Sequence, residues 1–327
     1  MKERIKWIDN ARGICMFCVL LAHSNVNHPI LHTLYTPWFL TLFFWISGYL
    51  FSTRSLKEDI IKIVKHLLVP YFLLSFLLFF IGIDNWAALF KCDMEYLYNK
   101  VYYILIGKNL WFIPCLIVVQ LYVSILSHTI MKSLRMKLLV CIIMFGSVYL
   151  IRNKDGYVAP YCADIALFAT AYFLMGNIVR KVNFSQFLSV SKLRYILNKP
   201  IWSILMLIIY MVISYILQRN IGMEFHFATN YYDNPFLFIL LSIIGIIVLC
   251  LFSNIFSAKF LRLLGENTLI AFAFNGKAYA ISIIFISSFK LCNQELFAIL
   301  LSSVEVFVLL IIAYMINRFT PWLIGKY

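Results

Sequence analysis

The chain has 327 residues, of which 63% are apolar and only 13% charged, and its mean hydropathy is +0.89. A soluble domain could not cover its surface with so few polar groups, so the composition excludes one and predicts an integral membrane protein in contact with membrane lipids. The formal net charge of +14 does not indicate a nucleic-acid partner, because Lys and Arg fall in short clusters between apolar runs, which is typical of topology signals.

The apolar runs predict ten membrane-spanning helices, since about 20 apolar residues suffice for one crossing and no run shows the period of two of a barrel strand. The predicted spans cover residues 8–26, 37–53, 66–83, 109–127, 138–152, 164–180, 200–218, 236–254, 267–289 and 296–317. The first span follows Met1–Lys6 without a small-residue cleavage motif, so we expect it to be retained. The fold class is therefore an all-α bundle of about ten transmembrane helices. We expect one domain over residues 1–327, with no appended soluble domain.

Lys and Arg are distributed unevenly between the two sides of this predicted bundle. If the N-terminus is cytoplasmic, 20 of the 28 basic residues fall in cytoplasmic segments and seven in outer loops, while Lys277 falls within a span. Cytoplasmic loops of membrane proteins carry the excess of Lys and Arg. We therefore expect both termini in the cytoplasm, which agrees with an even number of spans.

The first span carries the most ionisable residues, namely Asp9, Arg12 and His23. Such side chains are costly inside a bilayer, so each needs a partner, a water-filled cavity or a function. The eleven-residue step from Arg12 to His23 returns to nearly the same helix face while rising about 16 Å. A guanidinium at the cytoplasmic mouth and an imidazole deeper along one stripe suit a ligand with an anionic end and a reactive end. The alternative is that Arg12 only anchors the helix and His23 is an interfacial histidine.

The second span contains the step Ser47-Gly48 among aromatic residues, and we interpret this step first as close packing between helices. The cytoplasmic segment that follows, from Arg54 to Tyr71, concentrates positive charge before the third span. Anchoring at the cytoplasmic side explains this charge, but a phosphate site would use the same residues.

Two ionisable residues fall near the middle of the last two spans, Lys277 in the ninth and Glu305 in the tenth. In adjacent antiparallel helices they would lie at similar depth. We interpret them as a structural ion pair, with a role in substrate binding or proton transfer as the alternative.

The eight cysteines are scattered along the chain. Cys15 and Cys18 lie together inside the first span, where we interpret the pair as packing, and we expect no metal site. Cys92, Cys162 and Cys292 fall in predicted outer loops, so a disulfide between two of them is open, and their spacing does not choose the pair.

Aromatic residues make up 17% of the chain, and clusters of Tyr and Trp that include Trp111 fall at predicted outer interfaces. Tyr and Trp form belts at these interfaces in membrane proteins generally, although a platform for stacking sugars would look identical. We interpret these residues first as an interfacial belt.

Five segments stand out by their order and spacing. They are Trp7-Ile8-Asp9-Asn10-Ala11-Arg12-Gly13-Ile14 followed by His23, then Phe43-Phe44-Trp45-Ile46-Ser47-Gly48-Tyr49-Leu50, the basic run from Lys62 to Tyr71, Leu110-Trp111-Phe112-Ile113, and Leu264-Gly265-Glu266-Asn267-Thr268-Leu269. Together they resemble the motifs of the membrane acyltransferase family 3, in particular its short members of the fucose 4-O-acetylase and O-antigen acetyltransferase kind. The resemblance spans most of the chain.

This resemblance implies transfer of an acyl group, most often acetyl, from cytoplasmic acyl-CoA to a hydroxyl of a surface glycan or lipid-linked sugar. It also implies a multi-pass protein of the bacterial inner membrane. His23 matches the family's essential histidine and Arg12 its first-span arginine. Asn275 stands where many members have a histidine, which weakens a two-histidine mechanism, and His66 stands where many have an arginine, which leaves open the side chain that holds CoA phosphate.

We therefore expect acetyl-CoA as the acyl donor and His23 as the general base, with a transient acyl-histidine as an alternative. The expected catalytic residues are His23, Asp9, and the oxyanion donors Ser47 or Asn275. The expected donor-binding residues are Arg12, Arg54, Lys62, Lys65, His66, Tyr71 and Trp111.

Two other classes of function compete with this interpretation. A transporter or flippase for a glycan precursor would also use a multi-span bundle with a few buried charges, but the chain shows no internal repeat and no matching pair of broken helices. A membrane sensing module is the second rival. The acceptor sugar, the length of the acyl chain and the oligomeric state are left open by the sequence.

Overall fold

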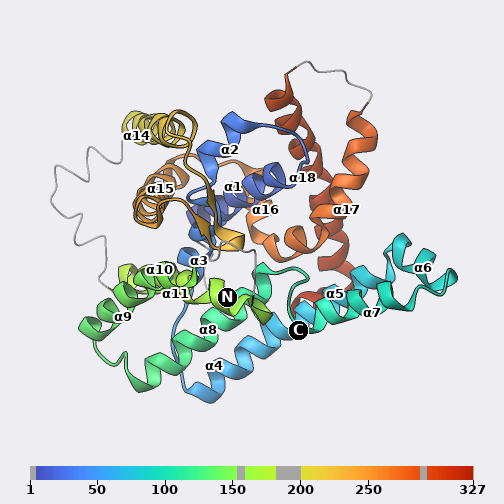
Figure 1. The fold of residues 1–327 in the computed structure, drawn as a ribbon, viewed down its shortest axis with the longest axis horizontal. Helices are drawn as coiled ribbons and strands as arrows, with labels where there is room; N and C mark the ends of the chain where they lie inside the picture. Colours follow the sequence, from blue (N-terminus) through green and yellow to red (C-terminus); the bar gives the residue numbers. More distant parts are fainter. Residues whose placement is uncertain (1–4, 153–158, 182–199, 288–292, 327) are drawn as a thin grey trace.

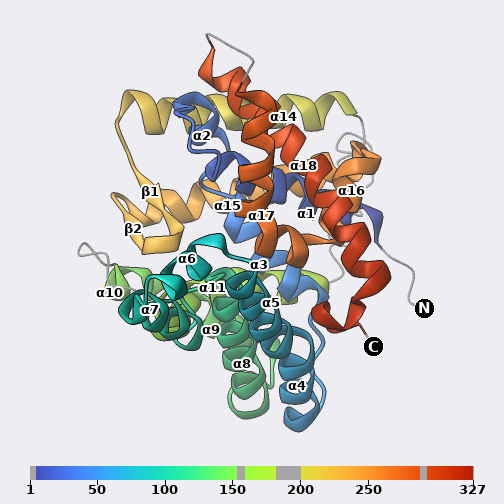
Figure 2. The same ribbon diagram turned by 90° about the vertical axis from the view of Figure 1, so that its right-hand side faces the viewer.

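The structure is a computed structural model that describes residues 5–152, 159–181, 200–287 and 293–326. The described chain is almost wholly helical, and Figures 1 and 2 show its helices gathered around α1. The first half comprises α1 (Lys6–Ala22), α2 (Pro29–Tyr35), α3 (Phe39–Leu50), α4 (Leu56–Ile63), the π-helix η1 (Val64–Leu68), α5 (Val69–Phe80), α6 (Ile83–Phe90), α7 (Met94–Leu105), α8 (Phe112–Thr129), α9 (Leu134–Gly146) and α10 (Val148–Ile151).

The second half adds long helices and one small sheet, in which β1 and β2 pair antiparallel with Phe225 opposite Tyr232. Its elements are η2 (Pro160–Cys162), α11 (Ala163–Lys181), α14 (Pro200–Tyr215), η3 (Ile216–Asn220), β1 (Phe225–His226), η4 (Phe227–Thr229), β2 (Tyr231–Tyr232), α15 (Pro235–Ile255), α16 (Lys259–Glu266), α17 (Thr268–Ile286), α18 (Gln294–Phe319) and η5 (Pro321–Ile324).

Nine helical stretches of the described chain are long and apolar enough to cross a membrane, and they match nine of the ten predicted spans. The remaining predicted span is α1, a 17-residue helix that packs against α3, α15, α16, α17 and α18. Because other helices surround α1, its Asp9 and Asn10 are buried against protein. The all-α, multi-span fold is confirmed.

The basic segment after the second span is helical, whereas the sequence analysis started the third span only at residue 66. Ser55 begins α4 by accepting a hydrogen bond from the Glu58 backbone at 3.3 Å, the first half of a capping box. The helix then continues through η1 and α5, so the span runs from Leu56 to Phe80. Within it Pro70 lacks a backbone N–H, and the turn before it widens to a π-helix. The basic side chains therefore project from a rigid helix.

The predicted outer loop before the fourth span contains the helices α6 and α7, which lie at the periphery of the bundle (Figure 1). Their surface is strongly apolar, with Ile83 81% exposed and Phe90 83% exposed. An amphipathic hairpin with such a surface is suited to the lipid interface.

Glycines bring α3 and α11 into backbone contact. A Cβ atom on Gly48 would lie 1.8 Å from the carbonyl oxygen of Phe173, and one on Gly176 would lie 2.0 Å from that of Trp45. The Ser47-Gly48 step is therefore a packing device, as predicted.

The crossing of α1 and α16 uses the same device. A Cβ on Gly13 would lie 1.9 Å from a carbonyl oxygen of α16, and one on Gly265 would lie 1.8 Å from the carbonyl oxygen of Asp9. The side chain of Asn10 donates to the carbonyl of Ser253 at 3.3 Å near the end of α15. Much of the first and last family-like motifs therefore serves architecture.

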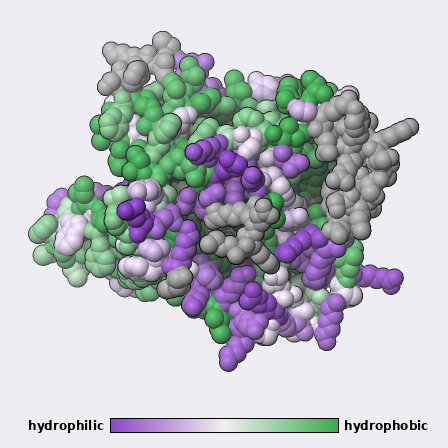
Figure 3. Space-filling model, turned by 180° about the vertical axis from the view of Figure 1, so that it is seen from behind, coloured by the Kyte–Doolittle hydropathy of each residue, from purple (hydrophilic) through white to green (hydrophobic). Residues whose placement is uncertain are grey.

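Helix ends meet at two opposite faces of the bundle. At one face, Arg180 at the end of α11 donates to the carbonyl of Leu50 at the end of α3, at 3.1 Å. Figure 3, seen from behind Figure 1, shows hydrophilic side chains gathered over the face on which α18 ends. At the other face, the Glu295 carboxylate at the start of α18 accepts from the backbone of Ile30 in α2, at 2.8 Å. In each contact the two helices run in the same direction, with their ends together at the first face and their starts together at the second.

Candidate active site

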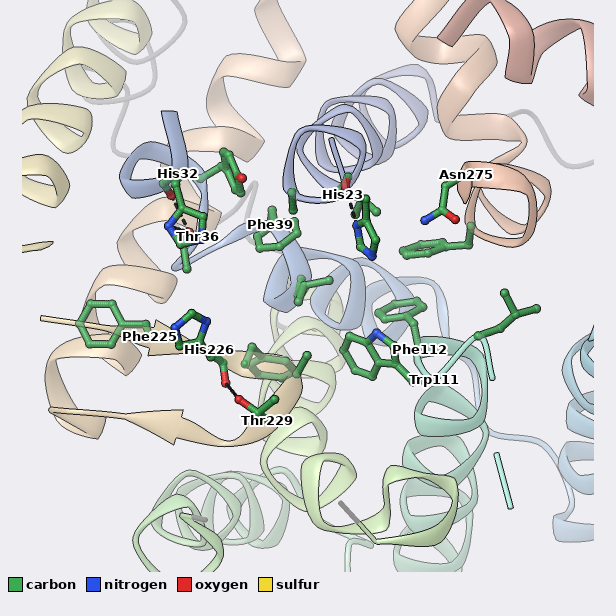
Figure 4. A pocket seen from close by; sticks show the side chains of 18 residues that line it. His23, His32, Thr36, Phe39, Trp111, Phe112, Phe225, His226, Thr229 and Asn275 are labelled. Atoms are coloured by element: carbon green, nitrogen blue, oxygen red, sulfur yellow. Dashed lines mark hydrogen bonds between the residues drawn. The ribbon is translucent and has the colours of Figure 1, made fainter. Parts of the chain in front are cut away.

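A cavity of about 420 Å³ opens where the end of α1 meets α2, α3, the start of α8, the β1–η4 segment and α17. Figure 4 shows His23, Trp111 and Asn275 on one side of it and His32 and His226 on the other. Three of the residues singled out from the sequence thus come together at one place.

His23 ends α1 as its C-cap, and the imidazole is turned back onto the helix. Its Nδ1 lies 2.8 Å from the carbonyl oxygen of Val19. A carbonyl oxygen only accepts, so Nδ1 must carry the hydrogen. In the neutral ring Nε2 is then the unprotonated nitrogen, and it is available to a group in the cavity (Figure 4). In this orientation Nε2 can accept a proton from a group in the cavity.

Asn275 lies on α17 and faces the cavity next to His23 (Figure 4). Its Oδ1 accepts a hydrogen bond from the backbone of Gly276 at 2.6 Å, which leaves the side-chain NH₂ to donate into the cavity. A fixed donor beside a base is the arrangement that stabilises an oxyanion formed in acyl transfer.

Aromatic rings form much of the cavity wall. The rings of Phe112 and Phe272 stack with centroids 4.7 Å apart, and this pair supports the wall behind Trp111. Trp111 is half-buried and lines the cavity at the start of α8. A large, rigid ring at a wet surface is suited to packing against the apolar face of a sugar. This favours the ligand-binding interpretation of Trp111 over the belt alone.

The opposite wall carries two histidines that the sequence analysis missed. His32 Nδ1 lies 3.2 Å from Thr36 Oγ1, whose own hydrogen is donated to the His32 carbonyl at 2.5 Å. The rings of His32 and His226 have centroids 6.3 Å apart. Three of the six histidines in the chain line this cavity. His23, His32 and His226 all fall at or beside the predicted outer ends of spans, and this grouping is the signal that could have revealed His32 and His226 from the sequence.

The basic residues expected to bind the donor lie away from the His23 cavity, and none of them lines it. Arg54 is held through its backbone, its N–H donating to Asp59 at 3.2 Å and its carbonyl accepting from His128 at 2.8 Å. Lys62, Lys65 and His66 are exposed on α4 and η1, and the ring of His66 contacts the Gly325 carbonyl at 3.1 Å. Arg12 is half-buried on α1, eleven residues and about 16 Å before His23.

Three expected site residues lie elsewhere. Tyr71 is fully buried and donates to the Ile104 carbonyl at 2.7 Å, so its hydroxyl fixes α5 to α7 and does not face a donor site. Ser47 donates to the Phe43 carbonyl of its own helix at 2.8 Å and does not line the cavity. Asp9 lies near the opposite end of α1 from His23. Trp111 was expected among the donor-binding residues, but it lines the cavity with His23 and does not lie with the basic segment.

The predicted ion pair between Lys277 and Glu305 does not form. Glu305 is buried in α18, and its Oε1 has no hydrogen-bond partner within the described chain. Lys277 lines a different cavity together with Lys100 and Lys108. Similar depth in neighbouring helices did not suffice, because Lys277 lines that cavity whereas Glu305 is buried within the bundle.

The cysteines within the described ranges are all free thiols. Cys15 and Cys18 are buried in α1, whereas Cys92 is exposed and Cys162 is buried. A disulfide between Cys92 and Cys162 is thus excluded, and Cys292 lies outside the described residues. In the part of the chain that the structure describes, no group of three or more His, Cys, Asp or Glu side chains could hold a metal ion.

A comparison with known protein families shows which family the chain belongs to. The family model of the acyltransferase domain matches residues 5–323, nearly the whole chain, while no curated protein and no solved structure matches it. The match includes every helix that forms the cavity. The chain therefore belongs to acyltransferase family 3, as a multi-pass membrane acyltransferase.

Proposed function

We propose that the protein transfers an acyl group, acetyl in the first instance, from cytoplasmic acyl-CoA to a hydroxyl of a surface glycan or lipid-linked sugar in the inner membrane. The observation that carries this proposal is the bond from His23 Nδ1 to the Val19 carbonyl, which presents Nε2 as a base to a 420 Å³ cavity.

The chemistry needs a base, an oxyanion donor and a sugar platform. Nε2 of His23 takes the proton of the acceptor hydroxyl as its oxygen attacks the thioester carbonyl. The NH₂ group of Asn275 donates to the oxyanion, after which the carbon–sulfur bond breaks and the CoA thiolate leaves and takes up the proton. Trp111 packs against the acceptor. In the alternative route, Nε2 itself attacks the thioester carbonyl and the carbon–sulfur bond breaks as the CoA thiolate leaves. The acyl-histidine then passes the acyl group to the hydroxyl, whose proton goes to the thiolate.

The donor would bind from the basic face. Cationic and hydrogen-bonding groups for the nucleotide phosphates would come from Arg54, Lys62, Lys65 and His66. Arg12 would add its guanidinium group from the cytoplasmic end of α1. The π-turn of η1 that carries Lys65 and His66 supports this assignment, because such turns occur frequently at functional sites. The pantetheine arm would then extend about 16 Å beside α1 to bring the thioester to His23.

The test uses membranes with and without the protein, radiolabelled acetyl-CoA, and candidate glycans or their lipid-linked precursors. Label that enters a glycan only when the protein is present supports the proposal. Movement of unmodified glycan across the membrane without labelling would favour the transporter. Absence of any acetyl-CoA binding would refute the choice of donor.

A further inference from the structure

A second cavity, of about 360 Å³, is lined by three lysines from three parts of the fold. Lys100 comes from α7, Lys108 from the turn before α8, and Lys277 from the middle of α17. Among the described residues that line it, Asp84 is the one carboxylate, so these four groups together carry a net charge of +2. We call this cavity the lysine cleft.

Within the described residues, none of the three lysines of the cleft forms an ion pair, and Asp84 offsets only one of their charges. The Nζ atom of Lys100 lies 5.2 Å from the centre of the Tyr96 ring, and that of Lys108 lies 5.7 Å from the Tyr103 ring. Such contacts leave the rest of each ammonium group open to an anion. Lys277 lies at the midpoint of a membrane-spanning helix, where a lysine is costly without a partner or a function.

Two segments contribute to the lysine cleft and to the His23 cavity alike. On α17, Asn275 lines the His23 cavity and Lys277 lines the cleft. In the turn before α8, Lys108 lines the cleft and Trp111 the cavity. The two cavities are therefore neighbours that share a wall.

The turn between the cavities is held in place by the backbone. Gly107 adopts a φ of +76°, and a Cβ there would lie 3.0 Å from Tyr161. The Tyr161 N–H donates to the Ile106 carbonyl at 2.7 Å, and the Lys108 N–H to that of Tyr103 at 3.0 Å. These contacts hold the backbone of the turn that carries Lys108 and Trp111.

We propose that the lysine cleft binds an anionic group, a phosphate or a carboxylate, of the acceptor glycan and so presents a nearby hydroxyl to His23. This inference rests on the proposed function and deepens it by naming the acceptor as a charged glycan. Ammonium groups are compact charges that bind phosphate and carboxylate oxygens strongly. Lys277 is half-buried, whereas Lys100 and Lys108 are exposed.

The experiment measures sugar binding by saturation-transfer NMR with purified protein in phosphatidylcholine nanodiscs and no acyl donor. Glucose, glucuronate and glucose 1-phosphate are the probes. At least one charged sugar should bind ten or more times more tightly than glucose, and the better one identifies the group. Equal binding of all three, or no binding of the charged sugars at millimolar concentration, would overturn the proposal.

Variants locate the effect. Lys277→Gln should abolish the preference for the charged sugar, and Lys277→Arg should retain it because the charge remains. Lys91→Gln removes the same charge from the exposed end of α6, outside the cleft, and should change nothing. A preference that survives in Lys277→Gln would contradict the assignment.

A lipid headgroup offers the same phosphate chemistry, so the measurement is repeated in nanodiscs that contain phosphatidylglycerol. If this lipid removes the preference for the charged sugar, the cleft binds headgroups and the acceptor proposal is refuted. A preference that persists supports it. Because no acyl donor is present, the result is independent of whether acyl transfer itself is found.

Discussion

The backbone contact between α3 and α11 predicts that Gly48→Ala destabilises the protein. The added Cβ would lie 1.8 Å from the carbonyl oxygen of Phe173 and 2.6 Å from its carbonyl carbon, both backbone atoms that no side-chain rotation can move. A Cβ does not approach such atoms closer than 3.0 Å, so α3 and α11 must separate locally by about 1.2 Å.

The free-energy cost follows from that separation. Gaps of 0.5–1 Å forfeit roughly a quarter to a half of each dispersion contact, and overpacked cores lose about 1–3 kcal/mol. The better helix propensity of Ala returns at most about 1 kcal/mol. We therefore expect a net loss on the order of 1–2 kcal/mol. Gly146→Ala is the matched control, because a Cβ there meets nothing within 4 Å and should be neutral or stabilising.

Thermal unfolding in detergent, followed with a thiol-reactive fluorophore, reports both variants. The buried free thiols Cys15 and Cys115 become reactive only when the bundle opens. Gly48→Ala should react at a lower temperature than wild type, and Gly146→Ala at the same or a higher one. A midpoint for Gly48→Ala equal to that of Gly146→Ala would refute the packing argument.

Three further changes give separate tests. Asn177→Leu removes two hydrogen bonds to carbonyls at the end of α3, and it also removes the acceptor of the buried Lys137 ammonium group. It should lower the free energy of unfolding by about 2–4 kcal/mol in the same assay, and a smaller effect than that of Gly48→Ala would contradict this expectation. Tyr71→Phe removes the hydroxyl hydrogen bond to the Ile104 carbonyl, which keeps its backbone hydrogen bond from Gly107, so the change should cost about 1 kcal/mol. The KM for acetyl-CoA should stay unchanged, and a raised KM would restore Tyr71 to the donor site. Trp111→Ala should lower kcat/KM for the acceptor roughly tenfold, about 1.4 kcal/mol, with donor binding intact, and a selective loss of donor binding would return Trp111 to the donor-binding group.

The positions and order of nine spans could be predicted from the sequence, because the length of an apolar run decides whether it crosses a membrane. The short helices were missed because their apolar stretches are too short to be recognised by length. In α4 and α6 the apolar face is only eight residues long, and its helical state depends on caps and on packing against the bundle.

The site was predicted in part. His23 was singled out because its polarity is costly within an apolar span, and Asn275 because it stands where many members of the family have a histidine. His32 and His226 were missed because they belong to a short helix and a two-residue strand, which only the fold brings together. The ion pair of Lys277 failed because depth along a helix follows from the sequence, whereas the direction of the side chain toward its neighbours does not.

The most direct test of the central claim is transfer of radiolabelled acetyl from acetyl-CoA by wild type and by His23→Gln, with donor binding and thermal unfolding measured on the same preparations. Gln keeps a hydrogen-bonding amide but has no basic nitrogen. We predict unchanged insertion, unfolding and acetyl-CoA binding, and a loss of transfer of roughly 10²–10⁴-fold. Full transfer by a folded His23→Gln protein would contradict the assignment of His23 as the base.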